Sequence, residues 1–201
     1  MPEGASRIAG VLLTGGRSSR LGSDKASLPT PDGSTLAVRT ARLLREVTDP
    51  TVEVGPGLSD LPRVVENDRE GPLGAVVAAV QALNARARPR PVLVVATDLP
   101  QLTIGVLRLL AEFPDDGSVV PSVDGVPQVL CARYSVPFLT KAVEAFAAGQ
   151  RSLSRLIREG DVALLTEDRW PALGHGAPFA DVDTPEDLRR MISAGVLAPR
   201  P

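Results

Sequence analysis

The chain alternates short apolar runs with amphipathic stretches. The runs at residues 8–13 and 92–96 contain no charged residue and are typical of strands buried on both faces of a parallel sheet. Other short apolar runs, bounded by glycine, proline or polar residues, predict further strands. The strands expected from this pattern cover residues 8–13, 51–54, 63–66, 92–96, 118–121, 128–134 and 162–165.

Helices are expected between these strands, where apolar residues recur at helical spacing behind residues that cap helix N-termini. Ser34 is the expected cap of the first helix, and Thr184, Pro185 and Asp187 form a capping-box start for the last one. The first helix is expected at residues 35–46, and those between it and the last one at residues 73–87, 103–113, 136–148 and 150–157. This alternation predicts an α/β fold in which helices cover both faces of a mostly parallel sheet.

No internal repeat, low-complexity tract or linker divides the sequence. Its 201 residues suit one α/β domain that is large enough to bury a core. We therefore expect a single domain over residues 1–201, with a core over about 7–194.

Composition narrows the classes of function. Basic and acidic residues nearly cancel, 22 against 24, which argues against nucleic-acid binding by bulk charge. The single cysteine excludes an internal disulfide and a multi-cysteine metal site. The sequence shows no signal peptide and no apolar run near the ~20 residues that a membrane helix needs. We therefore expect a cytoplasmic protein with no membrane or nucleic-acid partner.

The most informative stretch follows the first strand. It reads Leu13-Thr14-Gly15-Gly16-Arg17-Ser18-Ser19-Arg20-Leu21-Gly22-Ser23-Asp24-Lys25. Glycines let backbone N–H groups approach an anion closely, and arginine and lysine add charge-assisted donors. The stretch predicts a phosphate-binding loop, with a surface loop that is merely rich in glycine as the alternative.

Two common phosphate motifs are absent from this loop. It lacks G-x-x-x-x-G-K-[ST], which disfavours a P-loop kinase or NTPase, and it lacks G-x-G-x-x-G, which disfavours a dinucleotide-binding domain. The single histidine, His175, lies between two glycines and is expected to be an exposed loop residue, so no Ser-His-Asp set can be assembled.

Asp68 and Asp98 each follow a predicted strand. Because the carboxyl ends of parallel strands form the edge where ligands bind, both should meet the glycine-rich loop there. A carboxylate such as Asp98 suits Mg²⁺, and Lys25 and Arg20 suit the negative charge of a triphosphate. These groups predict nucleotidyl transfer, in which a substrate phosphate attacks the α-phosphorus and pyrophosphate leaves. The alternatives are a helix-capping role for Asp98 and a plain surface position for Lys25.

The glycine-rich stretch closely resembles the L-A-G-G-x-S-x-R-M-G-x-D-K-x-x-L motif of molybdenum cofactor guanylyltransferases, the MobA family. Four further segments resemble the family and extend the match from residue 8 to about 190. They are Gly71-Pro72-Leu73-Gly74-Ala75, Ala96-Thr97-Asp98-Leu99-Pro100, Pro127-Gln128-Val129-Leu130 and Asp181-Val182-Asp183-Thr184-Pro185-Glu186-Asp187-Leu188.

This resemblance implies a three-layer α/β/α domain with a Rossmann-like sheet of the nucleotide-diphospho-sugar transferase type. It implies transfer of GMP from GTP to molybdenum-bound molybdopterin with Mg²⁺, giving molybdopterin guanine dinucleotide and pyrophosphate. Molybdoenzymes or their chaperones are the further partners that it suggests.

The resemblance also carries roles onto individual residues. The implied nucleotide contacts are Leu13, Thr14, Gly15, Gly16, Lys25, Asp68 and Asp98, with Asn67 as the alternative to Asp68 at the base. The implied catalytic residues are Arg20, Lys25 and Asp98, and the implied metal ligands are Asp98 and Asp183. The implied pterin-side residues are Arg151, Ser152 and Asp181.

The sequence departs from the family pattern in three places. Thr14 stands where the family has alanine, and Val54-Gly55 stands where it has an asparagine that contacts the ribose or base. Asp181 and Asp183 replace asparagines, which leaves metal binding and hydrogen bonding to the pterin as alternatives for them.

Two rival functions stay open. A sister transferase could use CTP on a pterin, or act on a phosphosugar or phospholactate, with the same fold. The pairs Gly15-Gly16 and Asp24-Lys25 favour guanylyl transfer, because cytidylyl relatives tend to show A-A-G and lack the acid before the lysine. A non-catalytic nucleotide-binding or chaperone module is the second rival, which the filled catalytic positions disfavour.

Overall fold

A computed structural model describes residues 8–15, 24–65, 70–85, 87–114, 116–169 and 177–200. In these ranges, eight strands form a sheet in the order β3-β2-β1-β4-β7-β5-β6, with β8 paired to β5. The strands are β1 (Ala9–Leu13), β2 (Thr51–Val54), β3 (Arg63–Val64), β4 (Val92–Ala96), β5 (Ser118–Val123), β6 (Val126–Pro127), β7 (Cys131–Tyr134) and β8 (Val162–Leu165).

The predicted α/β fold with a mostly parallel sheet is confirmed. Strand β1 lies in the middle, parallel to both β2 and β4, and β8 runs parallel to β5. Strands β6 and β7 run antiparallel to β5, and β7 also runs antiparallel to β4. The chain reverses direction between β5 and β6, at a turn formed by Asp124 and Gly125, which both have positive φ. A connection this short can join only antiparallel strands.

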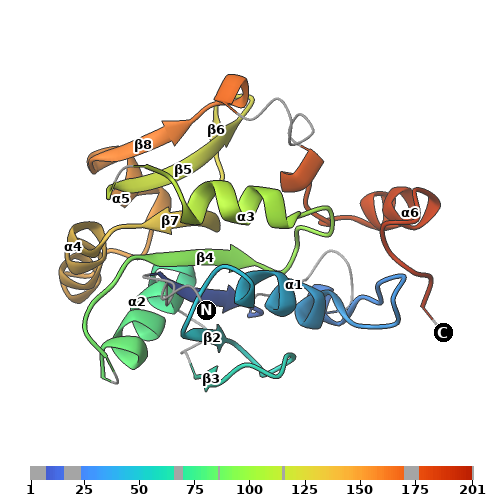
Figure 1. The fold of residues 1–201 in the computed structure, drawn as a ribbon, viewed down its shortest axis with the longest axis horizontal. Coiled ribbons are helices and arrows are strands. Elements are labelled where there is room, and N and C mark those ends of the chain that lie inside the picture. The colour runs from blue at the N-terminus through green and yellow to red at the C-terminus, as the bar shows by residue number, and fades with distance from the viewer. Residues whose placement is uncertain are drawn as a thin grey trace, which may run out of the picture.

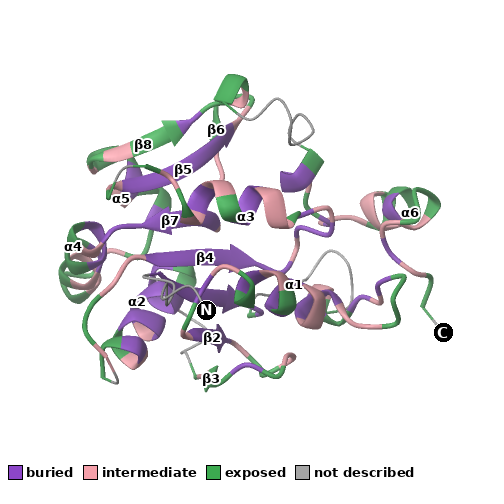
Figure 2. Cartoon of the chain, viewed as in Figure 1, coloured by how far each residue is buried: buried purple, intermediate pink, exposed green. Residues whose placement is uncertain are grey.

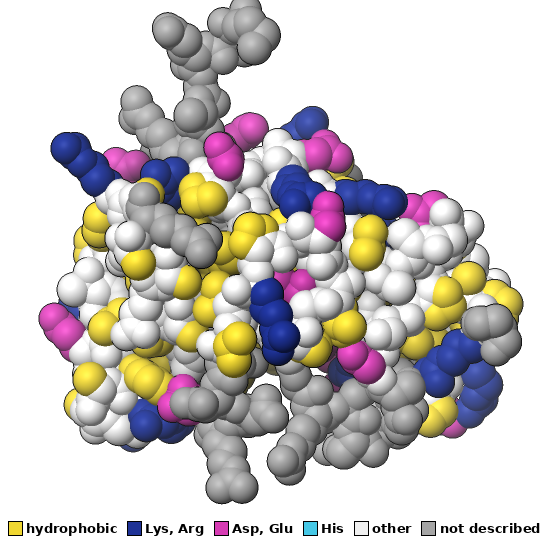
Figure 3. Space-filling model, turned by 90° about the horizontal axis from the view of Figure 1, so that it is seen from below, with side chains coloured by type: hydrophobic (Ala, Val, Ile, Leu, Met, Phe, Trp, Pro, Cys, Tyr) yellow, Lys and Arg dark blue, Asp and Glu magenta, His cyan; other side chains and the backbone are white. Residues whose placement is uncertain are grey.

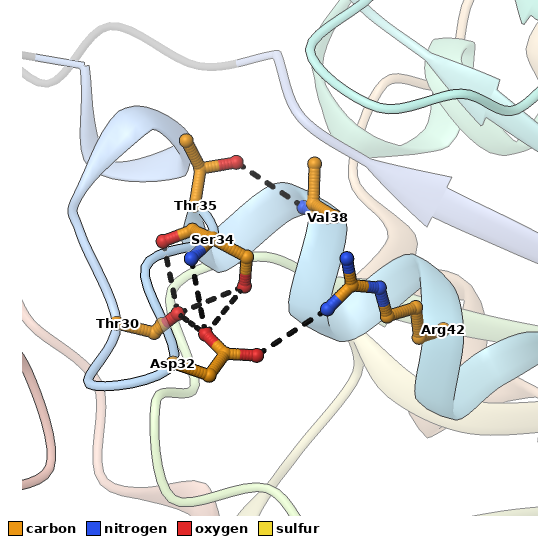
Figure 4. A network of polar contacts seen from close by, with 6 residues as sticks. All are labelled: Thr30, Asp32, Ser34, Thr35, Val38 and Arg42. Atoms are coloured by element: carbon orange, nitrogen blue, oxygen red, sulfur yellow. Dashed lines mark hydrogen bonds and ion pairs between the residues drawn. The ribbon is translucent and has the colours of Figure 1, made fainter.

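Six helices are described: α1 (Leu36–Arg45), α2 (Gly71–Asn84), α3 (Ile104–Ala111), α4 (Val136–Ala147), α5 (Leu153–Glu159) and α6 (Pro185–Ser193). The expected capping box of α6 is confirmed, with Thr184 and Asp187 bonded reciprocally. The expected cap of α1 is wrong. Thr35, not Ser34, accepts the bond from the Val38 N–H, while the Ser34 side chain bonds to Asp32 in the preceding turn (Figure 4).

The helices form two layers around the sheet (Figure 1). Alternate residues of each central strand point to opposite faces. Val11 and Val94 belong to the apolar cluster that contains α2, α4 and α5, whereas Leu12 and Val95 belong to the cluster that contains α1 and α3. Strands β1 and β4 are buried over their whole length, and exposure increases toward β8 and β3 at the periphery (Figure 2).

Helix α6 lies apart from these layers, on the side toward which β1 and β4 run (Figure 1). A third apolar cluster holds it there: Leu28, Leu36, Val182, Met191 and Leu197. This cluster joins the segments that follow Lys25 and precede α6, so it brings two distant parts of the chain to the carboxyl edge of the sheet.

None of the helices in the described ranges combines the length and apolar character needed to cross a membrane.

Candidate active site

Three segments meet at the carboxyl edge of the central strands. The Thr97 N–H, just after β4, donates to the carbonyl of Leu13 at the end of β1, with an N···O distance of 3.2 Å. The Val182 N–H donates to the Asp98 carbonyl at 3.1 Å. Backbone bonds therefore tie the end of β1, the end of β4 and the segment before α6 into one rim.

Lys25 lies at the centre of this rim. Its Nζ donates to Asp183 Oδ1 and lies 3.6 Å from Asp98 Oδ2, and its side chain is only 18% exposed. The alternative of a plain surface lysine is thereby excluded. Sequence reasoning brought Lys25 and Asp98 to one edge, and the structure adds that they share an ion-pair cluster with Asp183.

A short 3-10 turn, Lys25–Ser27, presents this lysine. The Asp24 side chain caps the turn by accepting from the Ala26 N–H at 3.0 Å, and Ala26 is buried beneath it. Asp24 thus fixes the backbone of the turn that presents Lys25. The sequence contained this signal, since an aspartate two residues before a free N–H is a common capping arrangement.

The charges of the cluster shift two pKa values. Burial alone would lower the pKa of Lys25, but the hydrogen bond to Asp183 and the negative charges of Asp98, Asp183 and Asp181 outweigh it, so the pKa is raised. Burial and the neighbouring Asp183 and Asp98 raise the pKa of Asp181. Lys25 therefore stays protonated at neutral pH, and the rim carries an excess of carboxylates that a second cation would relieve.

Asp98 does not cap the helix that follows it. The helix that follows it is capped by Thr103, whose hydroxyl accepts from the Val106 N–H, so the capping role considered for Asp98 is excluded. The side chains of Asp98 and Asp183 are 33% and 44% exposed, which leaves oxygens of both open to solvent.

The described residues hold no ready-made metal centre of three or more acidic, cysteine or histidine side chains. Asp98 and Asp183 nevertheless contact one amine, so a single cation in its place would face both. Mg²⁺ typically takes one or two carboxylates and completes its shell with water and phosphate oxygens. The donor set therefore fits a hard divalent cation such as Mg²⁺.

The end of β1 is the second part of the site. Leu13 and Thr14 are buried, whereas Gly15 is exposed where the glycine-rich loop begins. The Thr14 N–H donates to the Val54 carbonyl at 3.0 Å, and its hydroxyl donates to Glu53 at 2.5 Å. Sequence reasoning missed Glu53; the signal was a single acidic residue within the strand Thr51–Val54.

Arg151 and Ser152 lie at a different place from the Lys25 cluster. The Ser152 hydroxyl caps α5 by accepting from the Arg155 N–H. Arg151 stacks on the Phe146 ring, 4.2 Å from its centroid, and its carbonyl lies next to Gly71 at the start of α2. Their described contacts are therefore with the neighbouring Gln150 and with the helices α2, α4 and α5.

Three of the predicted site residues, Gly16, Arg20 and Asp68, lie outside the described residues, as do Asn67 and His175.

Charged side chains do not gather into a single basic surface on the face seen in Figure 3, where lysine and arginine are interspersed with aspartate and glutamate. This agrees with the near balance of charge in the sequence.

A mostly parallel sheet whose carboxyl edge carries a lysine between two aspartates is the arrangement of an α/β nucleotidyltransferase. The sequence matches the MobA-like NTP transferase domain over residues 10–164. The chain belongs to this family.

Two curated relatives are similar over most of the chain, and both bear the name probable molybdenum cofactor guanylyltransferase. The one from Mycobacterium bovis (strain BCG / Pasteur 1173P2) is 35% identical over 196 residues, covering 94% of each chain. The one from Opitutus terrae is 36% identical over 195 residues, covering 89% of this chain and 95% of that protein.

Solved structures share the fold. Molybdopterin-guanine dinucleotide biosynthesis protein A from Archaeoglobus fulgidus has a TM-score of 0.71 at 20% identity and covers 92% of this chain and 97% of its own. A manganese complex of Rv0371C from Mycobacterium tuberculosis H37Rv has a TM-score of 0.63 at 21% identity and covers 93% and 98%.

Proposed function

We propose that the protein transfers GMP from GTP to molybdenum-bound molybdopterin, forming molybdopterin guanine dinucleotide and pyrophosphate. Family membership and the names of the curated relatives support this choice of reaction. The observation that carries it is the Lys25, Asp98 and Asp183 cluster at the sheet edge, because it provides a cation and two carboxylates without a protein nucleophile.

In the proposed reaction, an oxygen of the substrate's terminal phosphate forms a bond to the α-phosphorus of GTP. The bond from the α-phosphorus to the bridging oxygen of the β-phosphate breaks, and pyrophosphate leaves with that electron pair. Such transfers depend on positioning and on stabilisation of charge. Lys25 supplies a protonated amine for the charge that develops on the phosphates.

Mg²⁺ is the proposed cofactor, with Asp98 and Asp183 as its protein ligands. When bound, the ion would neutralise phosphate charge. The protein's own part is to keep both carboxylates at one rim, which the backbone bond between Val182 and Asp98 does.

The nucleotide is assigned to Leu13, Thr14 and Gly15, with Gly16, Arg20 and Asp68 as the proposed contacts outside the described residues. On the pterin side, we assign Asp181 and Arg151 as candidate contacts. Ser152 would act there by fixing the start of α5.

The test is a nucleotide screen with Mg²⁺ and molybdopterin, scored by pyrophosphate release. GTP is expected to support turnover, with CTP and ATP at least tenfold poorer. A preference for CTP would replace this assignment by cytidylyl transfer. Nucleotide binding without pyrophosphate release from any triphosphate would instead indicate a non-catalytic binding module.

A further inference from the structure

Glu53 is an acidic residue inside an apolar strand. It lies in β2 with a relative exposure of 0%, on the sheet face that Leu12 shares. Strand β1 pairs Leu12 with Glu53, so Thr14, two residues further on, points to the same face and comes within reach of the carboxylate.

Both oxygens of this carboxylate are fully used. Oε1 accepts from the Thr14 hydroxyl at 2.5 Å and from the N–H groups of Gly57 and Leu58 at 2.9 and 2.7 Å. Oε2 accepts from the N–H and hydroxyl of Ser59 at 2.8 and 2.6 Å. Burial would raise the pKa of Glu53, but these bonds outweigh it and lower the pKa. Glu53 is therefore an ionised group with no lone pair left for a ligand.

The loop after β2 is also in direct contact with the start of the glycine-rich loop. A Cβ atom on Gly55 would lie 2.5 Å from the Thr14 hydroxyl and 2.6 Å from the Gly15 nitrogen, closer than real side chains allow. Gly55 has a φ of +140°. The start of the glycine-rich loop and the loop after β2 therefore touch at Gly55, and Glu53 bonds to both Thr14 and residues 57–59.

We propose that Glu53 is a positioning residue of the nucleotide site. Its buried carboxylate clamps the loop at residues 57–59 and, through the Thr14 hydroxyl, holds the Thr14–Gly15 backbone in the geometry that binds the nucleotide. This inference rests on the proposed nucleotide binding at the end of β1. It also gives a reason for the threonine at position 14, because an alanine there could not donate to the carboxylate.

The test compares GTP affinity, measured by calorimetry with Mg²⁺, in four proteins: the wild type, Thr14→Val, Thr14→Ser and Thr40→Val. Thr14→Val removes the hydroxyl at nearly constant volume, and Thr14→Ser keeps it. Thr40→Val is the matched control, because Thr40 is equally buried and its hydroxyl donates to the Leu36 carbonyl within α1. Amide exchange of residues 57–59 is measured alongside.

Thr14→Val is expected to raise the Kd for GTP about tenfold, through loss of a bond to a charged acceptor. Amide exchange at residues 57–59 should accelerate, Thr14→Ser should restore both values, and Thr40→Val should change neither. Equal GTP affinity in Thr14→Val and Thr40→Val would overturn the inference. Glu53→Gln, if it folds, should show the same direction of change as Thr14→Val.

The experiment distinguishes failure of the guanylyl assignment from failure of the positioning role of Glu53. If the wild type binds CTP rather than GTP, the guanylyl assignment fails, and the same four proteins are then compared with CTP. An unchanged Kd for CTP in Thr14→Val would overturn the role of Glu53, and a raised Kd would support it.

Discussion

At the scale of single residues, the most consequential fact is that Lys25 supplies the cation for two carboxylates. Replacing it by methionine keeps the length of the side chain and removes the charge. Turnover of Lys25→Met should fall by roughly 10²–10³-fold, the usual cost of losing one donor that stabilises the transition state. Asp98 and Asp183 would lose their internal partner, so Mn²⁺ should bind more tightly in the absence of nucleotide.

Turnover assays and Mn²⁺ titrations followed by electron paramagnetic resonance check both effects. Lys141→Met is the control, because Lys141 is an exposed lysine on α4. If Lys25→Met retains wild-type turnover, the amine does not act on the phosphates. An unchanged affinity for Mn²⁺ would show that the two carboxylates do not share one cation.

A second residue-scale prediction separates the two roles considered for Asp183. Asp183→Asn removes the charge and keeps the shape. If Asp183 is a metal ligand, the variant should bind Mn²⁺ about tenfold more weakly in the presence of GTP, because a neutral amide is a poorer ligand for a hard cation. Asp181→Asn, tested in parallel, should have a smaller effect. Full Mn²⁺ affinity in Asp183→Asn would instead favour hydrogen bonding to the pterin.

The sequence predicted part of this site. Lys25 and Asp98 were expected at one edge because Asp98 and the glycine-rich loop that contains Lys25 both follow strand ends. The backbone bond between Thr97 and Leu13 ties those two strand ends together. Glu53 was missed because most of its donors are backbone N–H groups of a loop. Such groups have no signature in the side-chain sequence, so only the folded loop shows that they converge.

At the scale of elements, the bounds of β2, β4 and β8 were predicted to the residue. Predictions failed where turns compete with strands. Residues 128–134 were expected to be extended, but only Cys131–Tyr134 pair as β7. The N–H of Cys131 donates to the carbonyl of Gln128, and that of Val129 to the carbonyl of Pro127, so this stretch folds into turns.

The start of α1 gives an element-scale prediction, because the adjacent hydroxyls of Ser34 and Thr35 have different hydrogen-bond partners there (Figure 4). Thr35→Ala should lower the free energy of unfolding by about 1 kcal/mol through loss of the cap. Ser34→Ala should instead raise the pKa of Asp32, which the side chains of Thr30 and Ser34 now hold well below its usual value. Chemical denaturation and a carboxyl NMR titration measure the two effects.

Each variant serves as the control for the other. A shift of the Asp32 pKa in Thr35→Ala, or no shift in Ser34→Ala, would contradict the assignment of the helix cap to Thr35 and of the Asp32 contact to Ser34. The sequence alone favoured the wrong cap because both residues are good capping types. Only the extended backbone conformation at Thr35 decides between them.

At the scale of the whole molecule, the candidate site depends on contacts between distant parts of the chain. The end of β1, the end of β4 and the segment before α6 are joined by backbone bonds, and the cluster around Leu28 and Met191 holds α6 against the sheet edge. A ligand that bridges these segments should therefore stabilise the folded state as a whole.

This leads to a prediction for thermal unfolding. A ligand that binds only the folded state at 100 times its Kd adds about 2.7 kcal/mol to the stability. For a chain of this size, each kcal/mol raises Tm by roughly 2–4 °C, so GTP with Mg²⁺ should raise Tm by about 5–10 °C. CTP and ATP at the same concentrations should give smaller shifts, and Lys25→Met should reduce the shift with GTP because the triphosphate loses its amine partner. Equal shifts with all three nucleotides would mean that the protein recognises the triphosphate and not the guanine.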